Sequence, residues 1–149
     1  MRRVKTNFLT ISFAFACVLA QAQVQPVRLR CEYLVEPLGI DVANPRLSWQ
    51  LQDDRHGAVQ REYRIIVGTD SADVSKGNGA VWHKSMPSDD MLVAYSGKPL
   101  TPFTKYFWRV EIKDMDNIPR TSEISSFETG MMDVKNWKGY WISDGEHLG

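Results

Sequence analysis

The sequence predicts an all-β domain, a sandwich of about seven short strands in two packed sheets. From Val27 onward, short runs recur in which apolar and polar side chains alternate, the period of a half-buried strand. Gly, Pro, Asn and Asp separate these runs at fairly regular intervals, and no long segment shows the helical period. Regular turns between short strands favour a sandwich over an α/β fold.

The first half of the chain holds three strand candidates, at residues 27–34, 46–51 and 62–69. Leu47 and Trp49 share one face of the second run, and Tyr63 and Ile65 share one face of the third. We expect these two faces to line the core of the sandwich. Turn-forming residues at 37–45 and polar residues at 53–57 separate the three runs.

The second half holds four more candidates, at residues 81–85, 92–95, 106–112 and 124–129. The run at 106–112 alternates most strongly, with Tyr106, Trp108 and Val110 on one face. Residues 70–79 are expected to form a loop in which 71–74 could make one helical turn. A hairpin-like turn is expected at 114–120.

The segment Leu100-Thr101-Pro102-Phe103-Thr104-Lys105-Tyr106 resembles the corner that enters the sixth strand of fibronectin type III domains, which have an immunoglobulin-like sandwich. Pro102 fixes φ and turns the chain between the sheets. Tyr106 can then bury its ring and return its hydroxyl to the backbone just upstream, so Tyr106→Phe should cost about 1–3 kcal/mol by stranding a buried backbone acceptor. The structural residues expected at this corner and in the core are Trp49, Tyr63, Leu100, Pro102, Tyr106 and Trp108.

The N-terminus has the features of a secretory signal peptide spanning residues 1–22. Arg2, Arg3 and Lys5 precede a short apolar run at 8–20, and Ala20-Gln21-Ala22 supplies the small residues that a signal peptidase recognises. The run is too short to span a bilayer, which takes roughly 20 apolar residues. We therefore expect export to the periplasm or the medium, with no transmembrane segment in the mature chain. Lipid attachment at Cys17 is the less favoured alternative, because the residues before it lack the usual leucine.

The charge balance of the mature chain excludes two classes of partner. Three of the 18 basic residues lie in the leader, which leaves 15 basic against 18 acidic residues, a net charge of about −3. Nucleic acid requires a clustered basic face, and anionic lipid a polybasic patch. Cys31 is the one cysteine outside the leader, so no internal disulfide is expected, and it is most simply a small buried hydrophobe.

Paired acidic residues are the first candidates for chemistry. Asp53-Asp54 and Asp89-Asp90 both lie in polar stretches rich in turn residues, where Asp favours the bend itself. The segment Asp114-Met115-Asp116-Asn117 resembles a calcium loop faintly, but the Gly and the distal Glu of such a loop are missing. All three segments are expected to be turns.

Histidines and serines give no stronger signal. His56, His83 and His147 are scattered, with no helical i, i+4 pair and no neighbouring cysteine, so no metal site is predicted. Ser48 and Ser96 lack the setting of a nucleophile elbow. The sequence therefore predicts no catalytic residue, no cofactor-binding residue and no metal ligand.

A narrower resemblance covers about residues 30–142. The chain resembles the N-terminal fibronectin type III-like (immunoglobulin-like) domain of bacterial α-L-rhamnosidases of glycoside hydrolase family 78. The matching segments are Glu36-Pro37-Leu38-Gly39-Ile40-Asp41, Asn44-Pro45-Arg46-Leu47-Ser48-Trp49, residues 60–67, Val81-Trp82, residues 95–100, residues 106–110, Phe127-Glu128-Thr129-Gly130 and residues 137–142. The segment His83-Lys84-Ser85 departs from the family, which often has an acidic residue, Ser and Gly there.

This resemblance implies a non-catalytic accessory sandwich of a secreted α-L-rhamnosidase. Enzymes of the family remove terminal L-rhamnose from plant polysaccharides and glycosides with inversion, using acidic residues of an (α/α)₆ barrel that lies beyond this segment. The expected organisation is a signal peptide at 1–22, a sandwich at 23–130, and a linker with the truncated start of a following β-domain at 131–149. No activity is expected from this chain alone.

Exposed aromatic residues leave an alternative open, a stand-alone carbohydrate-binding or protein-interaction module of the bacterial envelope. Trp82, Tyr95, Trp137 and Trp141 could stack on sugar rings, although core burial explains such residues more simply. Trp137 and Trp141 are expected to contact the following domain. The expected partners are therefore the following domains of the parent enzyme and, in the alternative, rhamnose-containing glycans.

Overall fold

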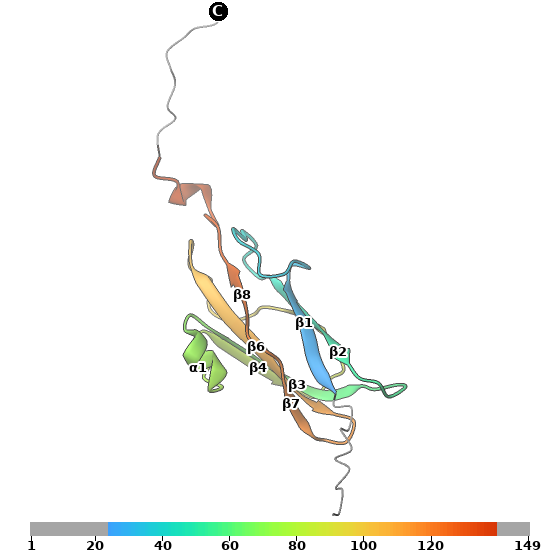
Figure 1. Ribbon diagram of the computed structural model, residues 1–149. Helices are drawn as coiled ribbons and strands as arrows, with labels where there is room; N and C mark the ends of the chain where they lie inside the picture. Colours follow the sequence, from blue (N-terminus) through green and yellow to red (C-terminus); the bar gives the residue numbers. More distant parts are fainter. Residues whose placement is uncertain (1–23, 140–149) are drawn as a thin grey trace, which may run out of the picture.

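The alternation in the sequence becomes two antiparallel sheets packed face to face in a computed structural model, which describes residues 24–139 (Figure 1). The first sheet has the order β1-β2-β5 and consists of β1 (Gln25–Cys31), β2 (Arg46–Gln52) and β5 (Leu92–Ala94). The second has the order β4-β3-β6-β7, with β8 also pairing with β6, and consists of β3 (Gln60–Gly68), β4 (Trp82–Met86), β6 (Lys105–Asp114), β7 (Pro119–Thr121) and β8 (Ser125–Glu128). The predicted all-β, immunoglobulin-like class is confirmed.

Strand boundaries differ from the prediction in two places. Eight strands form in residues 24–139 rather than about seven, because Pro119–Thr121, which was expected to lie in a turn, pairs with Glu111–Lys113 of β6. The first strand ends at Cys31 instead of Leu34. Glu32 and Tyr33 have positive φ angles of 49° and 65°, which turn the chain at that point.

The core lies between the two sheets and contains most of the predicted aromatic residues. Along β6, buried residues alternate with more exposed ones, and Trp108 and Val110 have no exposed surface. Leu47 and Trp49 of β2 face them from the other sheet within the same apolar cluster. Burying one such side chain contributes about 1.5–3 kcal/mol, so this alternation determines which face of each strand turns inward.

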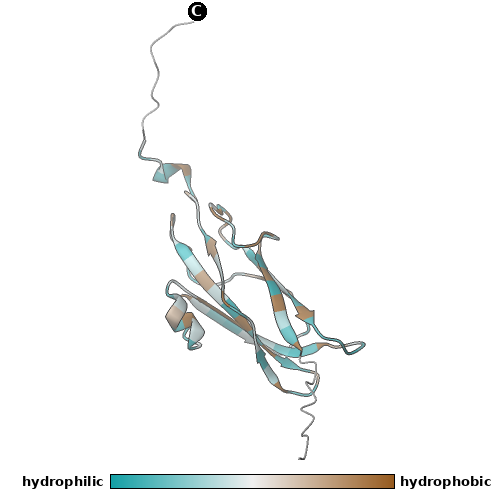
Figure 2. Cartoon of the chain, in the orientation of Figure 1, coloured by the Kyte–Doolittle hydropathy of each residue, from teal (hydrophilic) through white to brown (hydrophobic). Residues whose placement is uncertain are grey.

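The outer face of the second sheet carries a short helix, α1 (Ser71–Ser75), at the place where one helical turn was expected. The Asp70 side chain caps it by accepting hydrogen bonds from the N–H groups of Ala72 and Asp73. α1 packs on β3 and β6, where Ile66 and Val74 are fully buried. Figure 2 shows the apolar residues along the strands and on this helix.

Some predictions fall on residues that the structure does not describe. The signal peptide at 1–22, Cys17 and Trp141 all lie outside residues 24–139. Within that range, no helix has the length and apolar character needed to cross a membrane.

Candidate docking surface at the exit end

The chain leaves the sandwich at one end, which we call the exit end and which comprises residues 32–41, 101–104 and 128–137 (Figure 1). After β8 ends at Glu128, the chain continues between the loop that contains Ile40 and the loop that contains Phe103. Phe103 donates its N–H to the carbonyl of Gly130 at 2.9 Å, and Gly130 donates its N–H to the carbonyl of Ile40 at 2.9 Å. Ile40 and Thr129 form a parallel bridge. The departing chain is thus hydrogen-bonded on both sides.

Side chains fix the same segment more firmly. The Thr129 hydroxyl, which is buried, donates to the carbonyl of Thr101 at 2.6 Å and accepts from the N–H of Thr104 at 2.9 Å. Asp41 accepts the N–H of Met132 on its carboxylate at 2.7 Å. Gly130 permits this approach, since a Cβ there would lie 2.6 Å from Asp41 Oδ1. The direction in which the chain departs is therefore determined by the fold.

A tight turn beside this segment is held by an arginine. Cys31 and Leu34 exchange two backbone hydrogen bonds around Glu32 and Tyr33, whose positive φ angles are those of a type I′ turn. The guanidinium of Arg46 binds the Glu32 carboxylate, at 2.6 Å for the shortest contact, and lies over the Tyr33 ring, 4.7 Å from its centroid. These hydrogen bonds from Arg46 lower the pKa of Glu32.

Large apolar side chains are exposed at this end. In residues 24–139, six large hydrophobic side chains are at least 55 % exposed, and all six belong to the exit end. We call them the exit surface: Leu34, Val35, Leu38, Phe103, Val134 and Trp137. Figure 2 shows apolar colour on the loop between β1 and β2 that supplies three of them. An apolar group of this kind commonly marks an interaction site.

Sequence analysis identified only Trp137 of this surface. The other residues were missed because strand periodicity identifies buried faces and is silent on loops. One signal was present in the sequence. Val35 and Leu38 are apolar residues beyond the strand expected at 27–34, in a segment rich in turn formers where no strand could bury them.

The predicted structural residues lie in the core and at its corner. Trp49 packs edge-on against Tyr63, with 5.5 Å between ring centroids, and its indole N–H donates to Gln60 Oε1 at 2.9 Å. Leu100 is buried, Pro102 is half-buried, and Trp108 lies at the centre of the second sheet. The Gln60 side chain, itself buried, also donates to the carbonyl of Asp90 at 2.8 Å and so joins the core to a loop.

Tyr106 has the geometry of a tyrosine corner, with one correction. Its ring is buried and stacks on Phe127 at 5.3 Å, and its hydroxyl accepts the N–H of Thr101 at 2.8 Å. The expectation that a backbone acceptor bonds to this hydroxyl was wrong, because the backbone partner is a donor. Thr101 is itself exposed, so its N–H can be partly hydrated when the hydroxyl is removed.

The aromatic candidates for sugar stacking do not form a platform in the described chain. Tyr95 is buried, and Trp82 packs edge-on against it with 4.9 Å between ring centroids. Trp137 is 55 % exposed and has the backbone of Gly139 against its ring. A groove of about 640 Å³ runs between β1 and residues 123–125, and it has no aromatic residue in its lining. Aromatic stacking is therefore not available in that groove.

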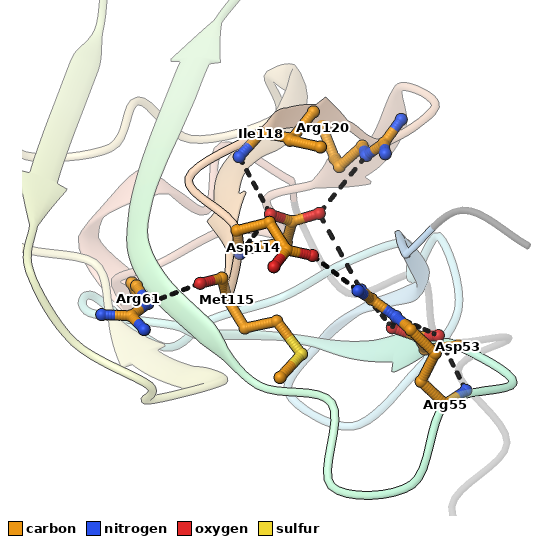
Figure 3. A network of polar contacts seen from close by, with 8 residues as sticks. Asp53, Arg55, Arg61, Asp114, Met115, Ile118 and Arg120 are labelled. Carbon is orange, nitrogen blue, oxygen red and sulfur yellow. Dashed lines mark hydrogen bonds and ion pairs between the residues drawn. The ribbon is translucent and has the colours of Figure 1, made fainter. Parts of the chain in front are cut away.

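A polar cluster ties two hairpins together on another part of the molecule (Figure 3). Arg55, from the turn after β2, binds Asp53 at 2.9 Å and Asp116 at 2.6 Å, and lies 4.0 Å from Asp114. Asp114 is buried at the end of β6 and accepts the N–H groups of Asp116 and Ile118. Two segments that were predicted separately as turns are thus joined by one guanidinium.

The carboxylates of this cluster are held by arginine, whereas a catalytic carboxylate pair needs one carboxyl group that stays protonated. Hydrogen bonds from Arg55 lower the pKa of Asp53, whereas a general acid needs a raised pKa. Asp114 Oδ2 is buried without a hydrogen bond and lies 3.7 Å from Arg120 Nε. No group of three His, Cys, Asp or Glu side chains in the described range could hold a metal ion. Cys31 is buried, and burial raises the pKa of its thiol to about 12.

Comparisons with known proteins place the chain beside one group of enzymes. The family model described as Rha78A-like, N-terminal immunoglobulin domain matches residues 26–133. An α-L-rhamnosidase of Streptomyces avermitilis is 40 % identical over 115 residues, which are 75 % of this chain and 11 % of that protein. An α-L-rhamnosidase of Alteromonas sp. is 31 % identical over 140 residues, which are 90 % of this chain and 15 % of that protein.

Solved structures agree with the sequence comparison. The α-L-rhamnosidase from Dictyoglumus thermophilum superposes with a TM-score of 0.78 at 35 % identity, over 83 % of this chain and 14 % of that one. The Streptomyces avermitilis α-L-rhamnosidase complexed with L-rhamnose superposes with a TM-score of 0.76 at 38 % identity, over 81 % of this chain and 12 % of that one. The chain therefore spans only about an eighth of the length of these relatives.

Proposed function

Because this chain belongs to the family of Rha78A-like N-terminal immunoglobulin domains, we propose that it serves as the non-catalytic accessory domain of an exported α-L-rhamnosidase. The observation that carries the proposal is the extent of the family match. Residues 26–133 include nearly all of the sandwich, and the same region is a small part of each much longer relative. Hydrolysis of α-L-rhamnosides then belongs to the parent enzyme and not to this domain.

The chemistry of the described residues supports a structural role. The acidic side chains that the fold brings together, Asp53, Asp114 and Asp116, surround the guanidinium of Arg55. An inverting glycosidase needs two carboxyl groups roughly 6.5–9.5 Å apart with water between them, one of them kept protonated. Hydrogen bonds from Arg55 lower the pKa of Asp53, so that carboxylate is unsuited to serve as the protonated acid.

The proposal assigns a role to each part of the chain. Residues 1–22 direct export and are removed, residues 23–130 form the sandwich, and residues 131–149 lead into a following β-domain. Trp137 and Trp141 contact that domain. Support comes from the charged start and A-x-A end of the leader, and from the way residues 129–132 are fixed against the sandwich.

Turnover of an aryl α-L-rhamnoside tests the accessory role. The purified 149-residue chain, incubated with p-nitrophenyl α-L-rhamnoside, is expected to release nitrophenol no faster than buffer does. The Streptomyces avermitilis α-L-rhamnosidase in the same assay serves as the positive control. Rhamnosidase turnover that co-purifies with the chain through two chromatographic steps would contradict the proposal.

Sugar binding is tested separately by affinity electrophoresis in rhamnose-rich pectin. We expect no retardation, because two of the three described candidates for sugar stacking are packed together, with Tyr95 buried and Trp82 edge-on against it. Retardation that disappears in Trp137→Ala, but not in Trp82→Ala, would place a sugar site in the segment after β8 and favour the carbohydrate-binding alternative.

A further inference from the structure

The exit surface lies outside the apolar core of the sandwich. Its six side chains are at least 55 % exposed, whereas the other exposed large hydrophobic residues of the described chain are 51 % exposed or less. They come from three separate segments: the loop between β1 and β2, the loop before β6, and the segment after β8. Their gathering at one end is therefore a property of the fold and not of one local sequence.

Backbone strain is concentrated at the same end. Seven non-glycine residues of the described chain have positive φ, and five of them belong to the exit end: Glu32, Tyr33, Glu36, Phe103 and Met132. Such conformations persist only where the surrounding structure enforces them, and they cluster at functional sites. Here Arg46 holds Glu32 and Tyr33, and Gly130 holds the backbone of Phe103.

The path of the chain identifies the occupant of this surface. The polypeptide departs from the exit end, and its direction is fixed as far as Met132 by the hydrogen bond to Asp41. Val134 and Trp137, in the departing segment, are themselves part of the surface. A domain that followed in the same polypeptide would lie near the exit end and would be present there at high effective concentration.

We propose that the exit surface is the docking site for the domain that follows in the same polypeptide, with Leu38 and Phe103 as its main apolar contacts and Arg46 as the residue that positions the loop carrying Leu34 and Val35. This inference rests on the proposed function, because it requires a longer parent chain. It adds the extent of the surface and the residues that form it.

The test compares hydrogen exchange in two proteins. One is the 149-residue chain alone. The other is a chimera in which residues 24–139 replace the matching segment of the Streptomyces avermitilis α-L-rhamnosidase, whose fold matches over 81 % of this chain. We expect amides of residues 33–41 and 101–104 to exchange at least about tenfold more slowly in the chimera, while β3 and β6 exchange at equal rates in both.

Two double variants decide whether the exit surface causes the protection. Leu38→Ser/Phe103→Ser should abolish the extra protection in the chimera. Val59→Ser/Ile118→Ser changes two apolar residues outside the exit end that are 46 % and 43 % exposed, and it should leave the protection unchanged. Protected β3 and β6 amides in both variants show that the sandwich itself remains folded.

Three results would overturn the inference. The first is that amides of residues 33–41 and 101–104 exchange equally fast in the chain and in the chimera. The second is that their extra protection survives in the Leu38→Ser/Phe103→Ser chimera. The third is a chimera in which the amides of β3 and β6 are unprotected, since the surface would then not fit the neighbouring domain. Protection that increases with concentration in the isolated chain would instead assign the surface to a second copy. Rhamnoside turnover by the isolated chain would contradict the accessory role alone, so the two proposals fail separately.

Discussion

Tyr106 joins the loop before β6 to the core through one hydrogen bond. Its hydroxyl accepts the N–H of Thr101, and its ring stacks on Phe127. The alternation in the sequence predicted the buried ring, because the strand period fixes which side chains turn inward. The direction of the hydrogen bond was not predictable, since a hydroxyl can donate or accept.

Replacing Tyr106 by Phe is expected to lower the free energy of unfolding by about 1 kcal/mol, the lower end of the usual range, because the exposed Thr101 retains some contact with water. Urea titration followed by tryptophan fluorescence measures it. Tyr33→Phe is the control, since its hydroxyl is held only by an exposed contact with Arg46 at 3.2 Å. Coinciding midpoints for Tyr106→Phe and the parent would contradict a stabilising tyrosine corner.

Cys31 is expected to be inert in the folded protein. Burial raises the pKa of this thiol to about 12, so little of it is ionised at pH 8, and the side chain is also inaccessible to reagents. In a Cys17→Ser chain, a thiol reagent at pH 8 should label nothing under native conditions and one thiol per chain in urea. Rapid labelling without denaturant would show that the end of β1 opens.

Pairs of hairpins are joined by contacts that no single segment of sequence reveals. Asp53 and Asp114 were each expected in a separate turn. Asp53 does lie in the turn after β2, and Asp114 is the last residue of β6, but the sequence did not show that Arg55 contacts both of them.

β7 was missed because its strand character also depends on a contact with another segment. It has three residues beginning with Pro119, too few to show a period, and its pairing with β6 arises from the hairpin around Asp114.

Acid should weaken the Arg55 cluster (Figure 3). The pKa of Asp53 is lowered in the folded state, so its stabilisation is present above the unfolded pKa, about 3.9, and is lost as the pH falls through the folded value. The stability difference between the parent and Arg55→Gln should therefore be greatest at pH 6 and shrink towards pH 2, as measured by urea unfolding.

Arg61→Gln is the matched control for this pH dependence. Arg61 donates to the carbonyl of Met115 at 2.9 Å in the same hairpin, and that acceptor does not titrate. Its stability difference from the parent should stay constant with pH. If the difference in stability between the parent and Arg55→Gln is equally constant with pH, the ion pair of Arg55 with Asp53 does not contribute to the loss of stability in acid.

Gly130 is expected to tolerate no side chain. An alanine Cβ would lie 2.6 Å from Asp41 Oδ1 and 3.0 Å from the carbonyl of Gly39, so Gly130→Ala should lower the free energy of unfolding by about 1–3 kcal/mol. Thermal unfolding measures this cost. In an Asp41→Ala background the cost should be smaller, because one of the two close contacts is gone, and equal costs would contradict the contact with Asp41.

For the whole molecule, the sequence predicted the fold class and the inward faces more successfully than the exposed surfaces. Trp49, Tyr63 and Trp108 lie in alternating runs, and burial of such runs is the main driving force for folding. Leu38 and Phe103 lie in turns, where exposure depends on which loops the fold brings together. Apolar residues in a turn-rich segment hinted at part of the exit surface, but its extent became visible only once the fold brought its three segments together.

Truncation should separate the sandwich from the segment that leaves it. A chain ending at Gly139 is expected to melt as the full chain does. A chain ending at Glu128 loses the hydrogen bonds of Thr129, Gly130 and Met132 and should be about 2–5 kcal/mol less stable. Circular dichroism melting compares the two. Equal melting would show that residues 129–132 are a passive linker.

The fixed exit of the chain has a mechanical consequence. The start of β1 and the end of β8 lie towards opposite ends of the sandwich, so tension applied between the two ends of the domain would enter along β1 and leave along β8 (Figure 1). Hydrogen bonds in an antiparallel ladder run perpendicular to the strands, so a pull along the strands loads many of them at once. The domain would bear such tension in shear, as a rigid tether, while the bonds of residues 129–132 would be the first to be loaded.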